Sequence, residues 1–164
     1  MADSKRQPTR LDRTDRRILR ILQEEGRVAN VELARRVHLT PTPCLERVRR
    51  LERDGYIEGY NARLNAAKLG IGLTVFIQLR LDQTSLDIFE RFHDAVMAMD
   101  EIVECHMVPG EFDYLLKIRV SDVGGYRWFM AERLPLLPGV IQTYSHVVME
   151  EVKVSPGFPV PGTY

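Results

Sequence analysis

The stretch TPTPCLERVRRLER, residues 40–53, predicts a short basic helix whose beginning is fixed by two prolines. Thr40 can act as the N-cap, because its hydroxyl can accept a hydrogen bond from an unpaired N–H of the first turn. Pro41 then occupies the first helical position, and Pro43 lies two residues further on. Neither proline costs a hydrogen bond there, because these N–H groups have no partner within the helix. The helix is therefore expected to begin at Pro41.

This predicted helix has two different faces at about 100° per residue. The face expected to pack on other helices carries Cys44, Leu45, Val48 and Leu51. The opposite face carries Thr42, Glu46, Arg49, Arg50 and Arg53, with Arg47 on the flank. A charged helix face is most often simply exposed to solvent. The preceding segment is therefore needed to distinguish a solvated face from a DNA-binding surface.

Two shorter helices are predicted upstream. The first runs from about Asp15 to Glu25, with Thr14 or Asp12 as its cap and Gly26 as its stop. The second is capped by Asn30, and residues 38–40 form the turn into the basic helix. Residues 56–62 then alternate like the strand of a wing. Three short helices and a wing predict a winged helix-turn-helix domain over residues 11–62, which would place the basic helix in the DNA major groove.

The net charge of zero hides an asymmetry between the two halves of the chain. Residues 1–69 hold sixteen Lys and Arg against ten Asp and Glu, a balance of +6, and residues 70–164 have a balance of −6. A basic half suits the phosphates of a nucleic acid. The asymmetry supports a DNA-binding N-terminal half and a different task for the C-terminal half.

Composition narrows the class of protein. The 164 residues are 45% hydrophobic, enough for one ordinary domain or two small ones. No apolar run approaches the roughly 18 residues of a membrane span, and the first ten residues are polar and basic rather than a secretory signal. The only cysteines are Cys44 and Cys105. We therefore expect no disulfide framework, no membrane partner and a cytosolic, reducing location.

The second half predicts a ferredoxin-like β-α-β-β-α-β domain, so that the chain as a whole is of the α+β class. Strands are expected over 73–81, 102–108, 114–120 and about 140–152, and helices near 86–96 and from about 122 to 135. The expected organisation is a basic disordered arm (1–10), the helix-turn-helix domain (11–62), a linker (63–72), the ferredoxin-like domain (73–153) and a Pro/Gly-rich tail (154–164). One face of such a sheet is not covered by helices, so we expect it to dimerise back to back.

Several segments together resemble the Lrp/AsnC family, the feast/famine transcription regulators of bacteria and archaea. The resemblance lies in residues 11–15, 30–34, 41–44 and 47–51 of the first half, and in 104–116, 137–140 and 146–152 of the second. It implies a transcription regulator of amino-acid metabolism that binds double-stranded DNA, forms homodimers and then octamers, and works on the bacterial nucleoid. The DNA-binding residues that it implies are Thr40, Thr42, Pro43, Glu46, Arg47, Arg49, Arg50 and Arg53.

The resemblance also implies a small amino-acid effector, with leucine as the first candidate, bound between modules of neighbouring dimers in a RAM/AsnC-type domain. The effector residues that it implies are Met107, Gly110, Asp113, Val123, His146, Val147 and Val148. Asp113 could pair with the ammonium of the ligand, and Gly110 lets the backbone approach it closely. Judged from the residues alone, 109–111 could be only a hairpin turn and Asp113 a surface carboxylate. His146 departs from the family, whose pocket can present an aromatic there, and it could change selectivity.

Other chemistry is weakly supported. Cys105 and His106 are neighbours on a strand and point to opposite faces, so they cannot easily bind one metal ion. No Cys/His spacing matches a zinc site, no catalytic set is clustered, and no cofactor motif is present. We expect no enzyme activity and no metal. The alternatives left open are a ligand-binding oligomeric module without DNA binding, and a small-molecule enzyme on a ferredoxin-like dimer.

Overall fold

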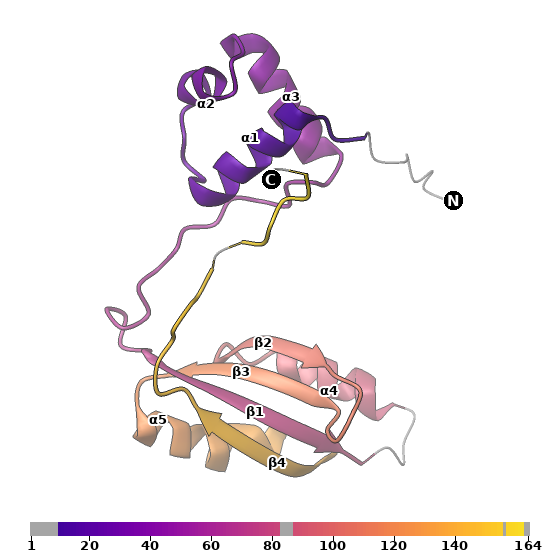
Figure 1. Cartoon of the computed structure of the whole chain (residues 1–164). Coiled ribbons are helices and arrows are strands. Elements are labelled where there is room, and N and C mark those ends of the chain that lie inside the picture. The colour runs from indigo at the N-terminus through magenta and orange to yellow at the C-terminus, as the bar shows by residue number, and fades with distance from the viewer. Residues whose placement is uncertain (1–9, 83–86, 156, 163–164) are drawn as a thin grey trace. The chain divides into compact units, whose positions relative to one another are not determined.

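The computed structural model describes residues 10–82, 87–155 and 157–162, and the chain divides into two compact units. The N-terminal unit is formed by residues 1–63 together with the returning tail 153–164, and the C-terminal unit by residues 64–152. Figure 1 shows the first unit built from helices and the second built from a sheet with its helices. The expected boundary between the helix-turn-helix domain and the linker, at residues 62–63, lies one residue from the observed division between residues 63 and 64.

The N-terminal unit is built from α1 (Arg13–Glu24), α2 (Asn30–Arg36) and α3 (Pro41–Arg53). Asp12, one of the two expected caps, closes a capping box on α1: its carboxylate accepts from the Asp15 N–H at 2.7 Å, and the Asp15 carboxylate accepts from the Asp12 N–H at 3.1 Å. Helix α3 begins at Pro41 as predicted, because the prolines suit only the first turn.

Two of the predicted caps are wrong in detail. The N-cap of α2 is Ala29, and Asn30 is its first helical residue. The Asn30 amide instead donates to the Pro41 carbonyl at 2.8 Å, so it joins the beginnings of α2 and α3. Thr40 occupies the N-cap of α3, but its side chain makes no capping hydrogen bond.

The three helices pack around a small apolar core. Its most buried members are Ile18, Leu33, Ala34, Cys44 and Leu51. Val48 packs against this core, but Leu45 is 37% exposed and does not belong to it. Leu45 lies about 100° from Cys44 around the helix, at the edge of the contact, where the residue type alone does not decide burial.

The predicted wing strand over residues 56–62 is absent from the described part of the chain. Tyr56 and Ile57 both donate their N–H groups to the Leu51 carbonyl, at 2.9 and 3.2 Å, which closes the end of α3. Beyond them the chain has neither helix nor strand as far as residue 65. A strand needs a neighbouring strand with which to pair, and residues 56–62 pair with no strand in the described part of the chain.

The C-terminal unit is the predicted ferredoxin-like fold. Strands β1 (Leu73–Leu81), β2 (Ile102–Met107), β3 (Tyr114–Val120) and β4 (Val140–Val147) form one antiparallel sheet in the order β2-β3-β1-β4, side by side in Figure 1. Helix α4 (Ile88–Met97) follows β1, and α5 (Val123–Trp128) follows β3. Leu86, expected in the first of these helices, lies outside the described residues.

One face of the sheet packs on the helices and forms the core. The inward side chains of the two central strands alternate along β1 and β3, and they meet Phe92 of α4 and Phe129. Phe92 and Tyr114 lie with ring centroids 4.6 Å apart, and His93 Nε2 is 2.9 Å from the Tyr114 hydroxyl. The core is therefore one layer between the sheet and the helices, which leaves the other sheet face open.

The last predicted helix is divided into three parts. Asp122 caps α5 by accepting from the Gly125 N–H at 2.9 Å, and the chain continues as a π-helix over Phe129–Arg133 and a 3-10 turn over Leu134–Leu136. The π-helical turn directs Phe129 and Leu134 towards the core, where both are buried. Periodicity at 3.6 residues cannot predict such a local widening.

The end of the chain differs from expectation in its packing. Strand β4 ends at Val147, not near residue 152, and the tail has no helix or strand among its described residues. The tail nevertheless packs on α1: the Gln23 side chain donates to the Phe158 carbonyl at 2.8 Å and accepts from the Phe158 N–H at 3.3 Å, while Val160 is 7% exposed. The described tail thus forms part of the N-terminal unit (Figure 1).

Candidate DNA interface and ligand site

The outward face of α3 is the candidate DNA interface. Six of the residues predicted to bind DNA are exposed there: Thr40, Thr42, Pro43, Glu46, Arg49 and Arg53. Arg49 forms no ion pair within the described ranges, and Arg53 makes only a loose one to Asp54 at 3.8 Å. This face therefore presents two arginines that are available to another molecule.

Arg47 and Arg50 lie on a different side of the helix. Arg50 Nη2 is 2.6 Å from Asp15 Oδ2, and Arg47 Nη1 is 2.8 Å from Asp15 Oδ1. Arg47 also pairs with Asp12, and these hydrogen bonds raise the pKa of its guanidinium. The prediction that Arg50 lies on the outward face is wrong, because its long side chain turns back to α1. Asp15 was not predicted as the partner of these arginines, although its spacing of three from Ile18 places it on the buried face of α1.

The basic residues of α2 are likewise paired within the unit. Arg35 and Arg36 both contact Glu32 at 2.8 Å, and their hydrogen bonds lower the pKa of Glu32 to about 2. Arg36 also reaches Glu25 at 2.6 Å. Because these charges of α2 are paired internally, α3 rather than α2 presents arginines that are available to another molecule.

The first group of predicted effector residues lies at the β2–β3 turn. The Asp113 carboxylate accepts from the Leu81 N–H at 2.8 Å, and its own N–H donates to the Leu79 carbonyl at 2.9 Å. These bonds hold Asp113 firmly at the end of β1. Gly110 has φ +155° and no atom within 4 Å of the position where a Cβ would lie, so a ligand could approach the backbone there. Met107 ends β2 and is 61% exposed.

The second group lies at the other end of the sheet. His146 pairs with Phe76 and Val147 with Val75, and the Val148 N–H donates to the Thr74 carbonyl at 3.0 Å. Val123 begins α5, three residues after β3 ends at Val120. Val123 and Val147 are exposed, although they are apolar.

The structure therefore does not bring the seven predicted effector residues together in one chain. The register pairs Leu73 with Val120 at one end of the sheet and Leu79 with Tyr114 at the other. Six residues of strand separate these pairs, about 20 Å at roughly 3.3 Å per residue. A single site with all seven residues requires two copies of the chain, with one end contributed by each.

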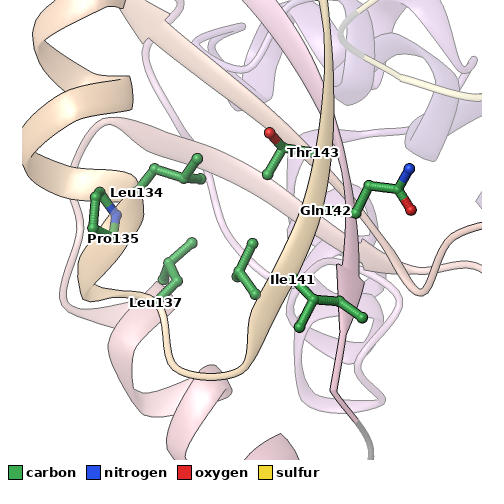
Figure 2. A pocket seen from close by; sticks show the side chains of 7 residues that line it. Leu134, Pro135, Leu137, Ile141, Gln142 and Thr143 are labelled. Atoms are coloured by element: carbon green, nitrogen blue, oxygen red, sulfur yellow. The ribbon is translucent and has the colours of Figure 1, made fainter.

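The hollow drawn in Figure 2 contains none of the predicted effector residues. It has a volume of about 260 Å³ and lies between the 3-10 turn and β4. Its lining residues are Leu134, Pro135 and Leu137 on one side and residues 140–143 of β4 on the other, and Thr143 points from β4 towards Leu134 (Figure 2). No charged side chain lines it, so it offers no ionic partner for either end of a free amino acid.

The open face of the sheet is polar and internally paired. Lys117 Nζ donates to Glu104 at 2.8 Å, which lowers the pKa of Glu104, and His106 Nε2 is 3.5 Å from the same carboxylate. Arg119 and the buried hydroxyl of Thr74 both bond to Glu151 at 3.0 Å. The face therefore carries specific charge pairs rather than a bare apolar surface.

Metal binding and membrane insertion find no support in the part of the chain that the structure describes. Within it, no three His, Cys, Asp or Glu side chains gather closely enough to hold an ion. None of its helices is both long and apolar enough to cross a bilayer. Cys105 packs against the core while its neighbour His106 is exposed, as expected from strand alternation.

Two family models match the chain, and together they cover both units. Residues 11–58 match a winged helix-turn-helix DNA-binding domain, and residues 74–158 match the Lrp/AsnC ligand binding domain. The second match extends over both groups of candidate effector residues.

Relatives match the chain over nearly its whole length. The leucine-responsive regulatory proteins of Klebsiella pneumoniae and of Escherichia coli K12 are each 56% identical over 156 residues, which is 94% of this chain and 95% of theirs. Among solved structures, a Neisseria meningitidis transcriptional regulator in complex with L-Met aligns with a TM-score of 0.89 at 36% identity, covering 93% of this chain and 98% of that one. An AsnC family regulator from Agrobacterium tumefaciens aligns with a TM-score of 0.86 at 35% identity, covering 91% and 97%.

Proposed function

The chain belongs to the Lrp/AsnC family of ligand-responsive, DNA-binding transcription regulators, and from that premise we propose that it binds specific operators through α3 and adjusts this binding to a free amino acid. The observation that carries the proposal is the outward face of α3, where Arg49 and Arg53 are exposed beside Thr42 and Glu46. Exposed arginines can pair with phosphates or with guanine edges. Thr40 and Pro43, at the beginning of the helix, complete the proposed contact surface.

The proposed regulator acts on genes of amino-acid metabolism in the bacterial cytoplasm, on nucleoid DNA, and has no catalytic role. Leucine is the first candidate effector, because the relatives at 56% identity are named leucine-responsive. Methionine is the second, because the neisserial regulator was solved in complex with it. Asp113 is proposed to pair with the ammonium of the ligand and the backbone near Gly110 with its carboxylate.

Assembly completes the proposed effector site. Met107, Gly110 and Asp113 of one copy are proposed to face Val123, His146, Val147 and Val148 of another. The separation of these groups by the length of the sheet supports this arrangement. The apolar side chains of Met107, Val123 and Val147 are exposed in the single chain, so they are available for contact with a second copy. Homodimers formed through the sheets, and octamers built from them, are the proposed assemblies.

Sedimentation equilibrium of the intact chain tests this assembly. Because apolar side chains of both edge strands, such as Met107 of β2 and Ile141 of β4, are exposed and would be covered in the proposed assemblies, we expect a mass well above the 18.9 kDa of one chain at micromolar concentration. An amino-acid effector that bridges two dimers should also shift the distribution between assemblies. A mass of one chain at all concentrations, with and without effector, would contradict the proposal.

Calorimetric titration with the proteinogenic amino acids tests the sensor. We expect saturable binding of leucine or methionine, and a gel shift at the same concentrations should show a changed affinity for an operator. D-leucine is the matched control, because it has the same apolar side chain but the wrong arrangement of ammonium and carboxylate. If none of the amino acids binds, the sensor proposal is wrong while the DNA-binding one stands.

A further inference from the structure

The most unusual charge in the N-terminal unit is a buried carboxylate. Asp15 is 1% exposed, and within the described residues only Thr74 is another buried polar side chain. Both of its oxygens are used: Oδ1 contacts Arg47 at 2.8 Å, and Oδ2 contacts Arg50 at 2.6 Å and accepts from the Asp12 N–H at 3.1 Å. An unpaired carboxylate in this position would be strongly unfavourable, so the cations of α3 are required for its burial.

The two arginines that satisfy Asp15 come from one side of α3. Arg47 and Arg50 are three residues apart, which places them one above the other on the helix. Their side chains are 30% and 29% exposed, against 68% for Arg53 on the outward face. Asp15 thus divides the arginines of α3 into an inward pair and an outward pair.

Only one rotation of α3 satisfies this carboxylate. Turning the helix by one residue in one sense would bring Glu46 and Arg49 to the positions of Arg47 and Arg50, and a second carboxylate would then face Asp15. Turning it in the other sense would bring Val48 and Leu51 there and leave Asp15 without a cation. The apolar contacts of α3 determine roughly which side of the helix faces the core. The ion pairs with Asp15 then restrict the rotation of α3 about its own axis further.

We propose that Asp15 is a positioning residue for operator recognition: through Arg47 and Arg50 it sets the rotation of α3 about its own axis. This keeps two arginines away from DNA and turns Arg49 and Arg53 outward together. The inference rests on the proposed DNA binding and adds the group that determines which side chains of α3 read the operator.

Asp15→Asn tests the proposal, because asparagine keeps the size and one accepting oxygen of the capping box but removes the charge. Two duplexes serve as probes: one selected from a random library by the wild-type chain, and a scrambled version. We expect the ratio of the two affinities to fall about tenfold, which corresponds to the discrimination supplied by one base contact. We expect the affinity for the scrambled duplex to stay at the wild-type value or to increase. We also expect this affinity to depend more steeply on salt, because Arg47 and Arg50 become available to phosphates.

Glu24→Gln is the matched control. It removes one negative charge from the same helix at an exposed position, so it should strengthen binding to both duplexes alike and leave their ratio unchanged. A variant that is merely less stable would weaken both duplexes in proportion, without changing the ratio or the salt dependence. Thermal unfolding followed by circular dichroism shows what fraction of each variant is folded.

Asp15→Glu is the second variant, in case Asp15→Asn does not fold. It keeps the charge but adds a methylene that displaces the arginines, so the ratio should fall while the salt dependence stays at the wild-type slope. A wild-type ratio in folded Asp15→Asn, or in Asp15→Glu if only that variant folds, would overturn the proposal. If the wild-type chain itself binds neither duplex, the proposed function fails instead.

Discussion

Replacing both Arg49 and Arg53 with alanine is expected to weaken binding to operator DNA by about 100-fold or more, the largest reduction that we expect from any pair of surface residues. A base contact by arginine contributes roughly 1–3 kcal/mol of discrimination, and removing one phosphate contact reduces the slope of log K against log salt by about 0.9. Both side chains are exposed on the outward face of α3. The stability of the fold should hardly change, because neither residue supports the core.

Fluorescence anisotropy with operator and scrambled duplexes at several salt concentrations measures this prediction. Arg17→Ala with Arg20→Ala is the matched control, since it removes the same charge from α1. The control should cost much less operator affinity and preserve discrimination. Equal reductions in the two double variants would mean that only net charge matters, and that α3 does not read the DNA.

Arg50→Ala should behave differently from Arg49→Ala, although the two residues are neighbours. Removal of Arg50 leaves the buried Asp15 short of a cation, which is expected to lower the free energy of unfolding, because removing one partner of a buried pair costs several kcal/mol. The salt dependence of DNA binding should stay near the wild-type slope. The contrast separates side chains that touch DNA from those that position the helix.

Asp113→Asn is expected to abolish the response to the amino-acid effector, the second of the large effects. The asparagine oxygen can still accept from the Leu81 N–H, which lies 2.8 Å from the carboxylate oxygen in the wild-type chain, so the end of β1 stays closed. The negative charge proposed to pair with the ammonium disappears. Removing one partner of a buried charge pair costs about 2–5 kcal/mol, which corresponds to a decrease in affinity of roughly 30-fold to several thousandfold.

Calorimetry with leucine and methionine, together with a gel shift without effector, measures this prediction. The affinity for operator DNA in the absence of effector should stay at the wild-type value. Glu111→Gln is the control, because it removes the same charge from an exposed side chain of the same turn. Asp113→Ala is less informative, since it also removes the acceptor for Leu81. Wild-type affinity for the effector in Asp113→Asn would exclude Asp113 as the ammonium partner.

The order and most boundaries of the elements could be predicted because their signals are local. Pro41 admits a helix only at its beginning, and α3 begins there. The alternation of Tyr114–Val120 indicates one buried and one less buried face, and β3 has these bounds. Strand β4 was predicted to be too long, because continued apolar residues do not reveal where a neighbouring strand ends.

Parts of the candidate site could not be predicted, for one physical reason. Periodicity says on which side of a helix a Cα lies, but an arginine side chain is long enough to reach a partner on another element. Arg50 turns inward because Asp15 of α1 needs a cation, and the two residues are far apart in sequence. The tail packs on α1 for a similar reason: Gln23 offers a donor and an acceptor to the backbone of Phe158.

The sequence by itself determined the two-unit organisation, the helix-turn-helix followed by a ferredoxin-like sheet, and the residue types offered to DNA and to an effector. These follow from composition, periodicity and turn residues, which act over a few neighbours in the chain. Only the tertiary structure decided which arginines of α3 stay outward, and that Asp113 and Val147 lie at opposite ends of one sheet. Both depend on contacts between distant segments, because a buried charge must find its counterion and a strand's register places its residues only when its neighbours are paired.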